Sequence, residues 1–400
     1  MPERIYTIAL YAQDKHGLGH INRTLAIARR LLAAQPRAVA VILTKSGIPS
    51  IFSVPERCDF IKLPVRITPA EVTQTAAEQE AARARHRALT RQLLRDAVVG
   101  LAPELVLVDH EPLGYGGEFR DGLYALKERS PATRFVFGLR DIMDDPARIR
   151  LQWQVLGAYE AMEHLFDGIA VYGAEQVYNV AEAYALPEAV RAKLHYCGYI
   201  VRDPPAPNPH IIRAEYGLPE RAPLIVAAVG GGSDGYPALA AAVAALEQVR
   251  ARQRDLCAIV VTGPLMPAEQ RRTLLALATG WRRVVEQADI FALMAAADAA
   301  ITMGGYNTVS EALAMACPAV IVPRATHKVE QLLRAQTLEE LDLARCVPPH
   351  TLTAERVADA LDWALQLDRS DYAARVRRHI PSFDGAAALA AYLAPWLVGR

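Results

Sequence analysis

Short runs of β-branched residues alternate along the chain with longer stretches rich in Ala, Leu and Arg at helical spacing. Strands that alternate with helices predict parallel sheets covered on both faces. In the first half, the expected strands are residues 5–10, 39–43, 60–63, 105–108, 134–137 and 168–171. The Arg-rich stretch 78–99 predicts a long helix with a solvated face, or alternatively a contact with an anionic membrane surface or a charged acceptor.

The alternation breaks at the Pro-rich segment 201–209 (VRDPPAPNP), which is typical of a linker, and then restarts. The second set of expected strands is 224–229, 258–261, 283–285, 299–302 and 319–322, with helices over 237–252, 267–278, 290–296 and 308–316. An Ala-rich helix is expected over 384–396. The predicted organisation is an α/β domain over 1–200, a linker over 201–215, a second α/β domain over 216–380 and a C-terminal helix within 381–400. A cleft between the domains is the expected ligand site.

Composition narrows the class of protein. The 400 residues carry 44 Lys+Arg and 44 Asp+Glu, and this balance argues against a dedicated nucleic-acid binder. No apolar run approaches the roughly 18 residues that a membrane-spanning helix needs. The five cysteines are scattered and form no C-x-x-C motif, so we expect reduced thiols in a cytoplasmic protein.

The first glycine turn, His16-Gly17-Leu18-Gly19-His20, follows the first expected strand and opens the next helix. Glycines let the backbone approach a ligand, and a helix N-terminus favours anions. A dinucleotide fingerprint is excluded, because Asn22 stands in place of its third glycine and no acidic residue ends the second strand. His20 is therefore predicted at the carboxyl edge of the first sheet, as a reactive group or as a capping residue.

A second glycine turn, Gly230-Gly231-Gly232-Ser233, directly follows the first strand of the second half. Backbone N–H groups in such a turn can cradle a diphosphate, although a flexible loop has the same composition. No Lys-Ser or Lys-Thr pair follows, which excludes a P-loop ATPase.

A third motif links strand 299–302 to its helix with the sequence M-G-G-Y-N-T-V-S-E over residues 303–311. Glu311 has capping-box spacing from Thr308, but a carboxylate there could equally accept hydrogen bonds from the hydroxyls of a ribose. Downstream, the segment 323–331 (PRATHKVEQ) brings Arg324, His327, Glu330 and Gln331 to the same edge of the sheet.

With these motifs, the second half resembles the nucleotide-sugar-binding domain of MurG-type and related UDP-glycosyltransferases of the GT-B fold. The N-terminal half is also similar to bacterial "predicted glycosyltransferases" in its segments V-D-H-E-P at 108–112 and L-R-D at 139–141. The resemblance implies two Rossmann-like α/β domains facing a cleft, with a C-terminal helix that returns to the first domain. It departs from the MurG pattern in three places: the N-terminal loop has fewer glycines, Met303 stands where a polar or basic residue is common, and Glu330 stands where MurG has Gln.

The resemblance also implies roles for individual residues. The loop of Gly230, Gly231, Gly232 and Ser233 would hold the diphosphate, Glu311 the ribose, Glu330 and Gln331 the sugar hydroxyls, and the backbone around Gln287 the base. Gly304, Gly305, Asn307, Thr308 and Arg324 complete the expected donor set. His20 is the candidate general base, oriented by Asp109, and Gly19, His110, Glu111, Arg140 and Asp141 are expected on the acceptor side.

The implied activity is that of an inverting glycosyltransferase, of hexosyl or N-acetylhexosaminyl type. It would move a sugar from a nucleoside-diphosphate sugar, foremost a UDP-sugar, to the hydroxyl of a small molecule, glycan or glycolipid. No cofactor or metal is expected, because helix N-termini and the glycine loop would stabilise the leaving diphosphate. Asp144-Asp145, before Pro146, is interpreted as a helix-start turn instead of a metal pair. The expected partners include no nucleic acid, and the expected location is cytoplasmic, with the inner membrane face as a peripheral contact.

Two alternatives share the fold, because fold does not fix function. A nucleotide-sugar 2-epimerase would convert the donor without any acceptor. A non-catalytic binding protein would bind the donor and turn over nothing.

Overall fold

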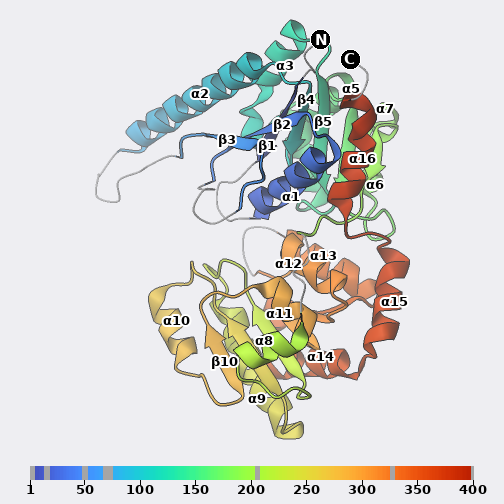
Figure 1. Cartoon of the computed structure of the whole chain (residues 1–400). Coiled ribbons are helices and arrows are strands. Elements are labelled where there is room, and N and C mark those ends of the chain that lie inside the picture. The colour runs from blue at the N-terminus through green and yellow to red at the C-terminus, as the bar shows by residue number, and fades with distance from the viewer. Residues whose placement is uncertain are drawn as a thin grey trace. The chain divides into compact units, whose positions relative to one another are not determined.

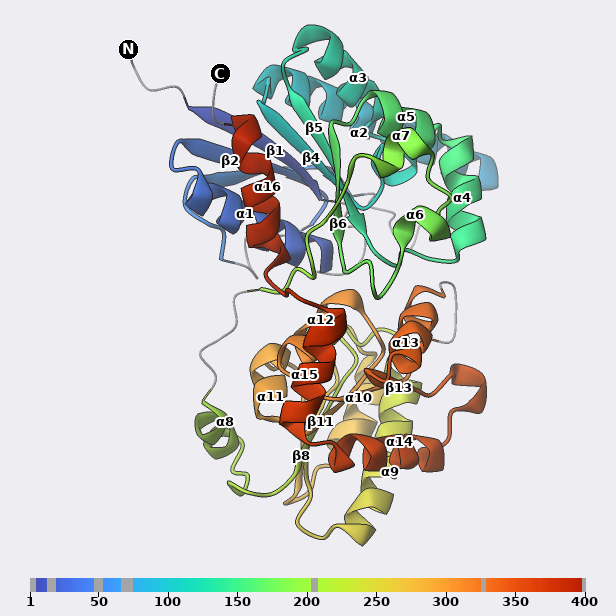
Figure 2. The same cartoon turned by 90° about the vertical axis from the view of Figure 1, so that its right-hand side faces the viewer.

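The computed structural model describes residues 5–12, 19–46, 53–65, 75–202, 208–324 and 329–397. The chain divides into two compact units, which are shown in Figures 1 and 2. The first unit comprises Met1–Glu175, Asn179–Arg202 and Asp384–Arg400, and the second comprises Gln176–Tyr178 and Asp203–Phe383. Each unit is an α/β structure with its own parallel sheet, as the alternating pattern predicts.

The sheet of the first unit has seven strands in the order β3-β2-β1-β4-β5-β6-β7. The strands are β1 (Tyr6–Ala12), β2 (Ala38–Thr44), β3 (Cys58–Lys62), β4 (Leu105–Asp109), β5 (Arg134–Arg140), β6 (Gly168–Tyr172) and β7 (Leu194–Tyr196). Every neighbouring pair is parallel, so the carboxyl ends of all seven strands lie at one edge. Strands β4 and β6 are buried throughout, because helices cover both faces of the sheet.

The helices of the first unit include the C-terminal one. They are α1 (Gly19–Ala34), α2 (Ala76–Leu101), α3 (Arg120–Arg129), α4 (Pro146–Val155), α5 (Ala158–His164), α6 (Val180–Ala183), α7 (Glu188–Arg191) and α16 (Gly385–Leu397). Helix α16 packs against α1, and an ion pair of 3.2 Å joins Arg30 Nη2 to Asp384 Oδ2. A Cβ on residue 385 would lie 2.6 Å from the carbonyl oxygen of Gly198, so only glycine allows this close approach. The predicted return of the C-terminal helix to the first unit is confirmed.

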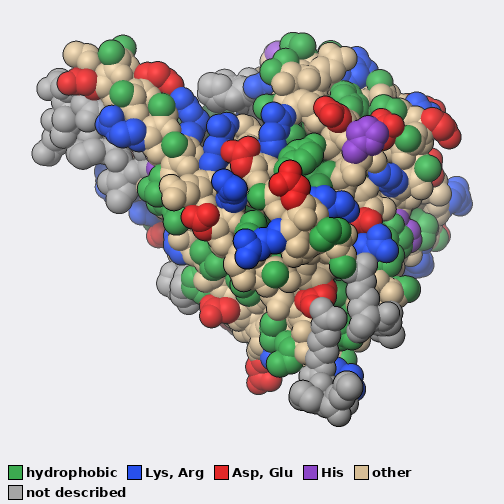
Figure 3. All heavy atoms as spheres, turned by 90° about the horizontal axis from the view of Figure 1, so that it is seen from above, with side chains coloured by type: hydrophobic (Ala, Val, Ile, Leu, Met, Phe, Trp, Pro, Cys, Tyr) green, Lys and Arg blue, Asp and Glu red, His purple; other side chains and the backbone are tan. Residues whose placement is uncertain are grey.

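Helix α2 is solvated along most of its length. Its buried residues are Thr90, Leu94 and Val98, all in its second half, while Arg87 Nη2 pairs with Glu80 Oε1 at 2.7 Å on the surface. Figure 3 shows side chains of both charges interspersed over one face of the molecule. The solvated face expected for this helix is observed, and the alternative contact with a membrane stays a prediction.

The sheet of the second unit has six strands in the order β10-β9-β8-β11-β12-β13. The strands are β8 (Leu224–Ala228), β9 (Cys257–Val261), β10 (Arg282–Val285), β11 (Ala299–Thr302), β12 (Ala319–Ile321) and β13 (Ala344–Cys346). The helices are α8 (Pro209–Glu215), α9 (Tyr236–Arg252), α10 (Ala268–Leu275), α11 (Ile290–Ala296), α12 (Tyr306–Ala314), α13 (Glu330–Glu340), α14 (Ala354–Gln366) and α15 (Arg369–His379). All strand pairs are parallel, so this sheet also gathers its carboxyl ends at one edge.

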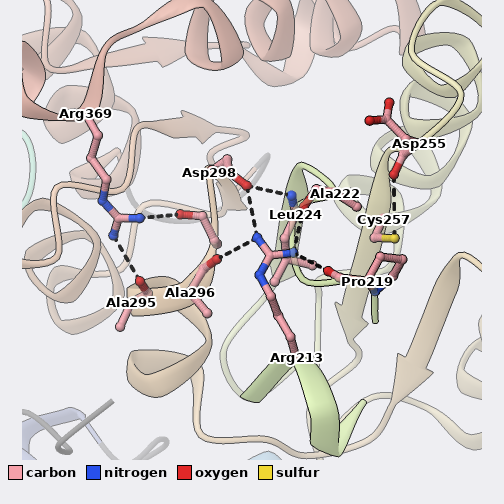
Figure 4. A network of polar contacts seen from close by, with 11 residues as sticks. Arg213, Pro219, Ala222, Leu224, Asp255, Cys257, Ala295, Ala296, Asp298 and Arg369 are labelled. Atoms are coloured by element: carbon pink, nitrogen blue, oxygen red, sulfur yellow. Dashed lines mark hydrogen bonds and ion pairs between the residues drawn. The ribbon is translucent and has the colours of Figure 1, made fainter. Parts of the chain in front are cut away.

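Two arginines tie together the opposite edge of the second sheet, where β8 and β11 begin (Figure 4). Arg213 of α8 donates to the carbonyl oxygens of Pro219 and Ala222, at 3.1 and 2.6 Å. Asp298, just before β11, accepts the backbone N–H of Leu224 at 2.7 Å and lies 3.4 Å from Arg213 Nη2. Arg369 of α15 donates to the carbonyl oxygen of Ala295 at 3.1 Å. Buried carbonyls need such donors, so these arginines fix the amino ends of the strands.

Candidate functional site

His20 and Asp109 meet at the carboxyl edge of the first sheet. Asp109 is the last residue of β4, and His20 lies in the first turn of α1, the helix that follows the neighbouring strand β1. His20 Nδ1 is 2.7 Å from Asp109 Oδ2. An ionised carboxylate only accepts hydrogen bonds, so we assign the proton to Nδ1, which donates a hydrogen bond to Asp109. In this tautomer Nε2 keeps its lone pair and can accept a proton.

Arg23 completes this group, although the sequence reasoning missed it. Its buried guanidinium donates through Nη2 to both carboxylate oxygens of Asp109, at 2.9 Å to Oδ1 and 2.8 Å to Oδ2. Burial of Asp109 raises the pKa of its carboxyl, but the charge of Arg23 and the hydrogen bond from His20 outweigh burial and leave that pKa below its usual value. The available signal was spacing, since residues three apart on a helix lie on one face.

The pKa of the His20 imidazole is lowered from its ordinary value, and burial is the largest cause. The hydrogen bond and charge of Asp109 work in the opposite direction, while the charges of Arg23 and Arg140 lower the pKa further. The imidazole is therefore neutral at physiological pH, as a general base must be. The His20 side chain keeps 21% of its surface exposed, against 2% for Asp109.

The residues expected on the acceptor side lie near this group. The rings of His110 and His20 are 4.8 Å apart between centroids, and His110 has a left-handed backbone with φ of 75°. Glu111 is buried and accepts the N–H of Gly116 at 3.0 Å. Arg140 is buried at the end of β5. Gly19 is the first residue of α1, whereas His16, Gly17 and Leu18 lie outside the described residues.

Asp141 has internal partners for both of its carboxylate oxygens. It is fully buried, and it accepts from the hydroxyl of Tyr199 at 2.6 Å and from the N–H of Ile142 at 2.7 Å. These contacts join the end of β5 to the segment that leads out of the first unit's sheet. They give Asp141 a structural role, beside which its expected contact with an acceptor stays a prediction.

The glycine loop of the second unit is held in a conformation that requires glycine. Gly230 and Gly232 have φ of 63° and 87°, in the left-handed region. A Cβ on Gly232 would lie 2.1 Å from the carbonyl oxygen of Thr262. The carbonyl of Gly231 accepts the N–H of Leu265 at 2.7 Å. Helix α9 then begins with Gly235 as its N-cap and with no side-chain cap, so its first N–H groups are suited to an anion.

Of the two alternatives for Glu311, the capping box with Thr308 is wrong. Helix α12 begins at Tyr306, with Gly305 as N-cap and no hydrogen bond from a capping side chain. Thr308 is already inside the helix, and Glu311 lies in its second turn, half-buried. Gly304, with φ of 86°, forms the turn that leads into α12. The helix therefore begins without a Ser or Thr side chain as its N-cap. Asn307 and Thr308 occupy the first turn as half-buried residues.

Arg334 links the remaining donor motifs and was also missed by the sequence reasoning. This buried residue of α13 donates through Nη1 to the carbonyl oxygen of Gly304 and to Glu330 Oε1, both at 2.9 Å. Gln331 Oε1 accepts the N–H of Arg324 at 2.9 Å. Glu330 and Gln331 are thus both engaged within the unit, and their expected contacts with a sugar stay predictions.

The other donor residues follow strand ends of the same sheet. Arg324 Nε pairs with Asp234 Oδ2, next to Ser233 of the glycine loop, at 2.8 Å. Gln287 is exposed just after β10, and its neighbour Glu286 accepts the N–H of Gly263 through its carbonyl at 3.0 Å. His327 lies outside the described residues.

Asp144 and Asp145 form the predicted helix start. Asp145 is the N-cap of α4 and accepts the N–H of Arg148 at 2.9 Å, while Asp144 pairs with the Arg148 guanidinium at 3.2 Å. Within the described ranges, no three His, Cys, Asp or Glu side chains gather as a metal site would require. Across the same part of the chain, no helix combines the length and apolar character needed to cross a bilayer.

Comparisons with known proteins match part of the sequence to glycosyltransferases. Residues 226–383 match the model of the glycosyltransferase family 28 C-terminal domain. An uncharacterized glycosyltransferase of Methanopyrus kandleri is 26% identical over 187 residues, which cover 46% of this chain and 50% of that protein. The match thus spans about half the length of this curated relative.

Solved structures resemble the whole chain at low sequence identity. A UDP-glucosyltransferase from Polygonum tinctorium, solved as a complex, has a TM-score of 0.68 at 14% identity, with 100% of both chains covered. The calicheamicin glycosyltransferase CalG4 has a TM-score of 0.66 at 19% identity, again over 100% of both chains. Phytolacca americana UGT2, solved with UDP-2-fluoro-glucose and pterostilbene, has a TM-score of 0.68 at 14% identity and covers 99% of this chain and 100% of its own. The chain therefore has the GT-B fold of glycosyltransferases, and its second unit matches the C-terminal domain of glycosyltransferase family 28.

Proposed function

We propose that this protein is an inverting glycosyltransferase that moves a sugar from a UDP-sugar to a hydroxyl acceptor. The observation that carries the proposal is the His20–Asp109 pair, because it joins a neutral imidazole to a buried carboxylate at the edge where parallel sheets bind ligands. The match of the second unit to a glycosyltransferase donor domain supports the same activity.

In the proposed reaction, Nε2 of His20 accepts the proton of the acceptor hydroxyl. The oxygen then bonds to the anomeric carbon of the donor from the face opposite the phosphate, and the bond between that carbon and the phosphate oxygen breaks. The anomeric configuration is inverted, and the nucleoside diphosphate leaves with the electron pair. Asp109 stabilises the imidazolium that forms, since the Nδ1–H to Oδ2 contact becomes charge-assisted.

The second unit would bind the donor through backbone groups. The loop of Gly230, Gly231, Gly232 and Ser233, with the uncapped start of α9, would hold the diphosphate. Because these donors are fixed before the leaving charge develops, we propose that they replace a metal ion and that the protein needs no cofactor. Glu311 would bind the ribose hydroxyls, and the backbone near Gln287 the base.

The sugar would meet Glu330 and Gln331. Arg334 fixes the Glu330 carboxylate through Oε1, so this side chain would meet a donor hydroxyl in a defined orientation. A hexose or an N-acetylhexosamine fits this chemistry. UDP is favoured as the nucleotide because the Polygonum tinctorium and Phytolacca americana proteins are described with UDP-linked donors. The acceptor would be a small molecule, glycan or glycolipid, met in the cytoplasm or at the inner membrane face of a bacterium.

A thermal-shift panel of nucleotide sugars, followed by acceptor screening with the best donor, tests this proposal. We expect a raised melting temperature with UDP-sugars, and a product whose anomeric configuration, read by NMR, is opposite to that of the donor. Where a His20 variant is tested in the same assays, His164→Gln is its matched control, because His164 is an exposed histidine at the end of α5. If the donor alone is converted to a different sugar epimer, the protein is an epimerase and the proposed transferase function is wrong. Donor binding without turnover of any acceptor would leave a binding protein.

A further inference from the structure

The buried side chain of Arg23 contacts both members of the His20–Asp109 pair. Arg23 Nη2 contacts both carboxylate oxygens of Asp109, and Arg23 Nε lies 3.2 Å from Asp109 Oδ1. The guanidinium therefore binds the carboxylate through two nitrogens. Nη2 is also 3.0 Å from His20 Nδ1. The guanidinium group also lies over the ring of Tyr172, with 5.4 Å between the guanidinium carbon and the ring centroid. The side chain is 1% exposed, so its geometry is set by these neighbours.

Two donors therefore converge on one oxygen. Asp109 Oδ2 is 2.7 Å from His20 Nδ1 and 2.8 Å from Arg23 Nη2. If Nδ1 carried the lone pair, it would face the carboxylate oxygen and repel it. The shorter 2.7 Å contact therefore favours the tautomer with the proton on Nδ1, in which Nη2 donates to the carboxylate and not to Nδ1, and Nε2 stays available.

The charges around the imidazole have opposing effects. Asp109, from the end of β4, favours the imidazolium, whereas Arg23 on α1 and Arg140 at the end of β5 disfavour it. Within the part of the chain that the structure describes, the ring of His110, which follows β4, also faces the imidazole. A carboxylate acting alone would stabilise the protonated ring and remove the base from use near neutral pH.

We propose that Arg23 is a positioning residue that holds the Asp109 carboxylate in register and, through its own positive charge beside the imidazole, keeps His20 neutral with Nε2 as its proton-accepting nitrogen. The geometry carries this inference: one guanidinium contacts both members of the pair from their buried side. Only the catalytic consequence rests on the proposed function. The tautomer and charge of His20 are properties of the folded protein by itself.

The direct test is an NMR titration of His20 with ¹⁵N-labelled protein, its signals assigned against His20→Gln. In Arg23→Gln, which removes the charge but keeps a donor, we expect the His20 pKa to rise by about one unit. In Arg23→Lys, which keeps the charge but loses the fork, we expect a smaller rise and a mixture of the two neutral tautomers. Arg29→Met on the same helix is the control, because Arg29 bonds the carbonyl oxygen of Ser53 at the surface.

An unchanged His20 pKa and a single Nδ1–H tautomer in a folded Arg23→Gln protein would overturn the proposal. If Arg23→Gln does not fold, a fixed Nδ1–H tautomer in Arg23→Lys overturns it equally. When a transferase assay is available, the acidic limb of kcat/KM should move to higher pH in Arg23→Gln, by the same shift as the NMR pKa. If NMR gives the expected shift but no transfer is found with any acceptor, the proposed function fails while the role of Arg23 stands.

Discussion

The carboxyl edges of the two sheets carry different kinds of group. At the edge of the first sheet, charged side chains converge, with His20 and Arg23 both within 3.0 Å of the Asp109 carboxylate oxygens. At the edge of the second sheet, the loops are shaped by glycines, and the charges are engaged in pairs such as Arg324–Asp234 and Arg334–Glu330. Proton transfer needs a side chain of tuned pKa, whereas a diphosphate can be held by fixed backbone N–H groups.

This difference predicts different sensitivities. Isosteric substitution and pH should act on the first edge, because its proposed function depends on charge and tautomer. Addition of a single Cβ should act on the second edge, because its proposed function depends on backbone position.

The largest effect is expected at His20. His20→Ala removes the proposed base and should lower kcat by about 10²–10⁴-fold, with donor affinity within a few-fold of wild type, because the proposed donor site lies on the other unit. Turnover, donor affinity and melting temperature should be measured on the same preparation. Near-wild-type turnover in a stable variant would remove His20 from the mechanism and direct attention to Asp109, His110 or Glu111.

The second effect concerns Gly232. Gly232→Ala places a Cβ 2.1 Å from the Thr262 carbonyl oxygen, at a residue whose φ is +87°. Backbone strain of about 1–3 kcal/mol is expected, together with a loss of UDP binding. Calorimetry and denaturant unfolding measure the two losses. Gly280→Ala is the matched control, since a Cβ there meets nothing within 4 Å. Equal behaviour of the two variants would show that the loop conformation has no special role.

The third effect concerns Glu311 in α12. Glu311→Ala should weaken nucleoside diphosphate binding by on the order of tenfold or more, because one charge-assisted hydrogen bond to the ribose is worth roughly 1.5–3 kcal/mol. Calorimetry checks this, with the exposed Glu355 of α14 as the control Glu355→Ala. Unchanged affinity in a folded Glu311→Ala protein would leave this carboxylate a structural role only.

A smaller effect is expected from pH. The pKa of His20 is lowered, so the imidazole stays neutral through the physiological range and is protonated only below its ordinary value of 6.5. The kcat/KM should therefore be flat near neutral pH and fall as pH drops through the His20 pKa, by about tenfold per unit. A rate profile from pH 5 to 8 measures this limb. A fall that begins above the ordinary histidine value would contradict the proposed tuning.

The smallest effect is expected from chelation. If backbone N–H groups replace a metal at the diphosphate, activity should survive excess EDTA unchanged. Assays with EDTA, and with added Mg²⁺ or Mn²⁺, check this. If EDTA abolishes the activity and either ion restores it, the second edge depends on a metal ion. The proposal that backbone N–H groups hold the diphosphate without one would then be wrong.

The strand pattern and the glycine turns were readable from the sequence, because a buried parallel strand needs a continuous apolar run. The start of α12 was misread, since Thr308 and Glu311 match a capping box by spacing while Gly304 and Gly305 make the actual turn. Strands β7 and β13 were missed because each has only three residues and is largely half-buried, which leaves no hydrophobic signal.

The sequence by itself determined which residues could do the chemistry: a histidine after the first strand, an aspartate at the end of another, and glycine loops in the second half. Only the tertiary structure decided which of them meet. His20 and Asp109 are 89 residues apart, and strand order alone brings them together. Arg23 and Arg334 look like ordinary helix arginines in the sequence. Their importance appears only in the folded protein, where both side chains are buried and each guanidinium donates to a carboxylate, Asp109 or Glu330.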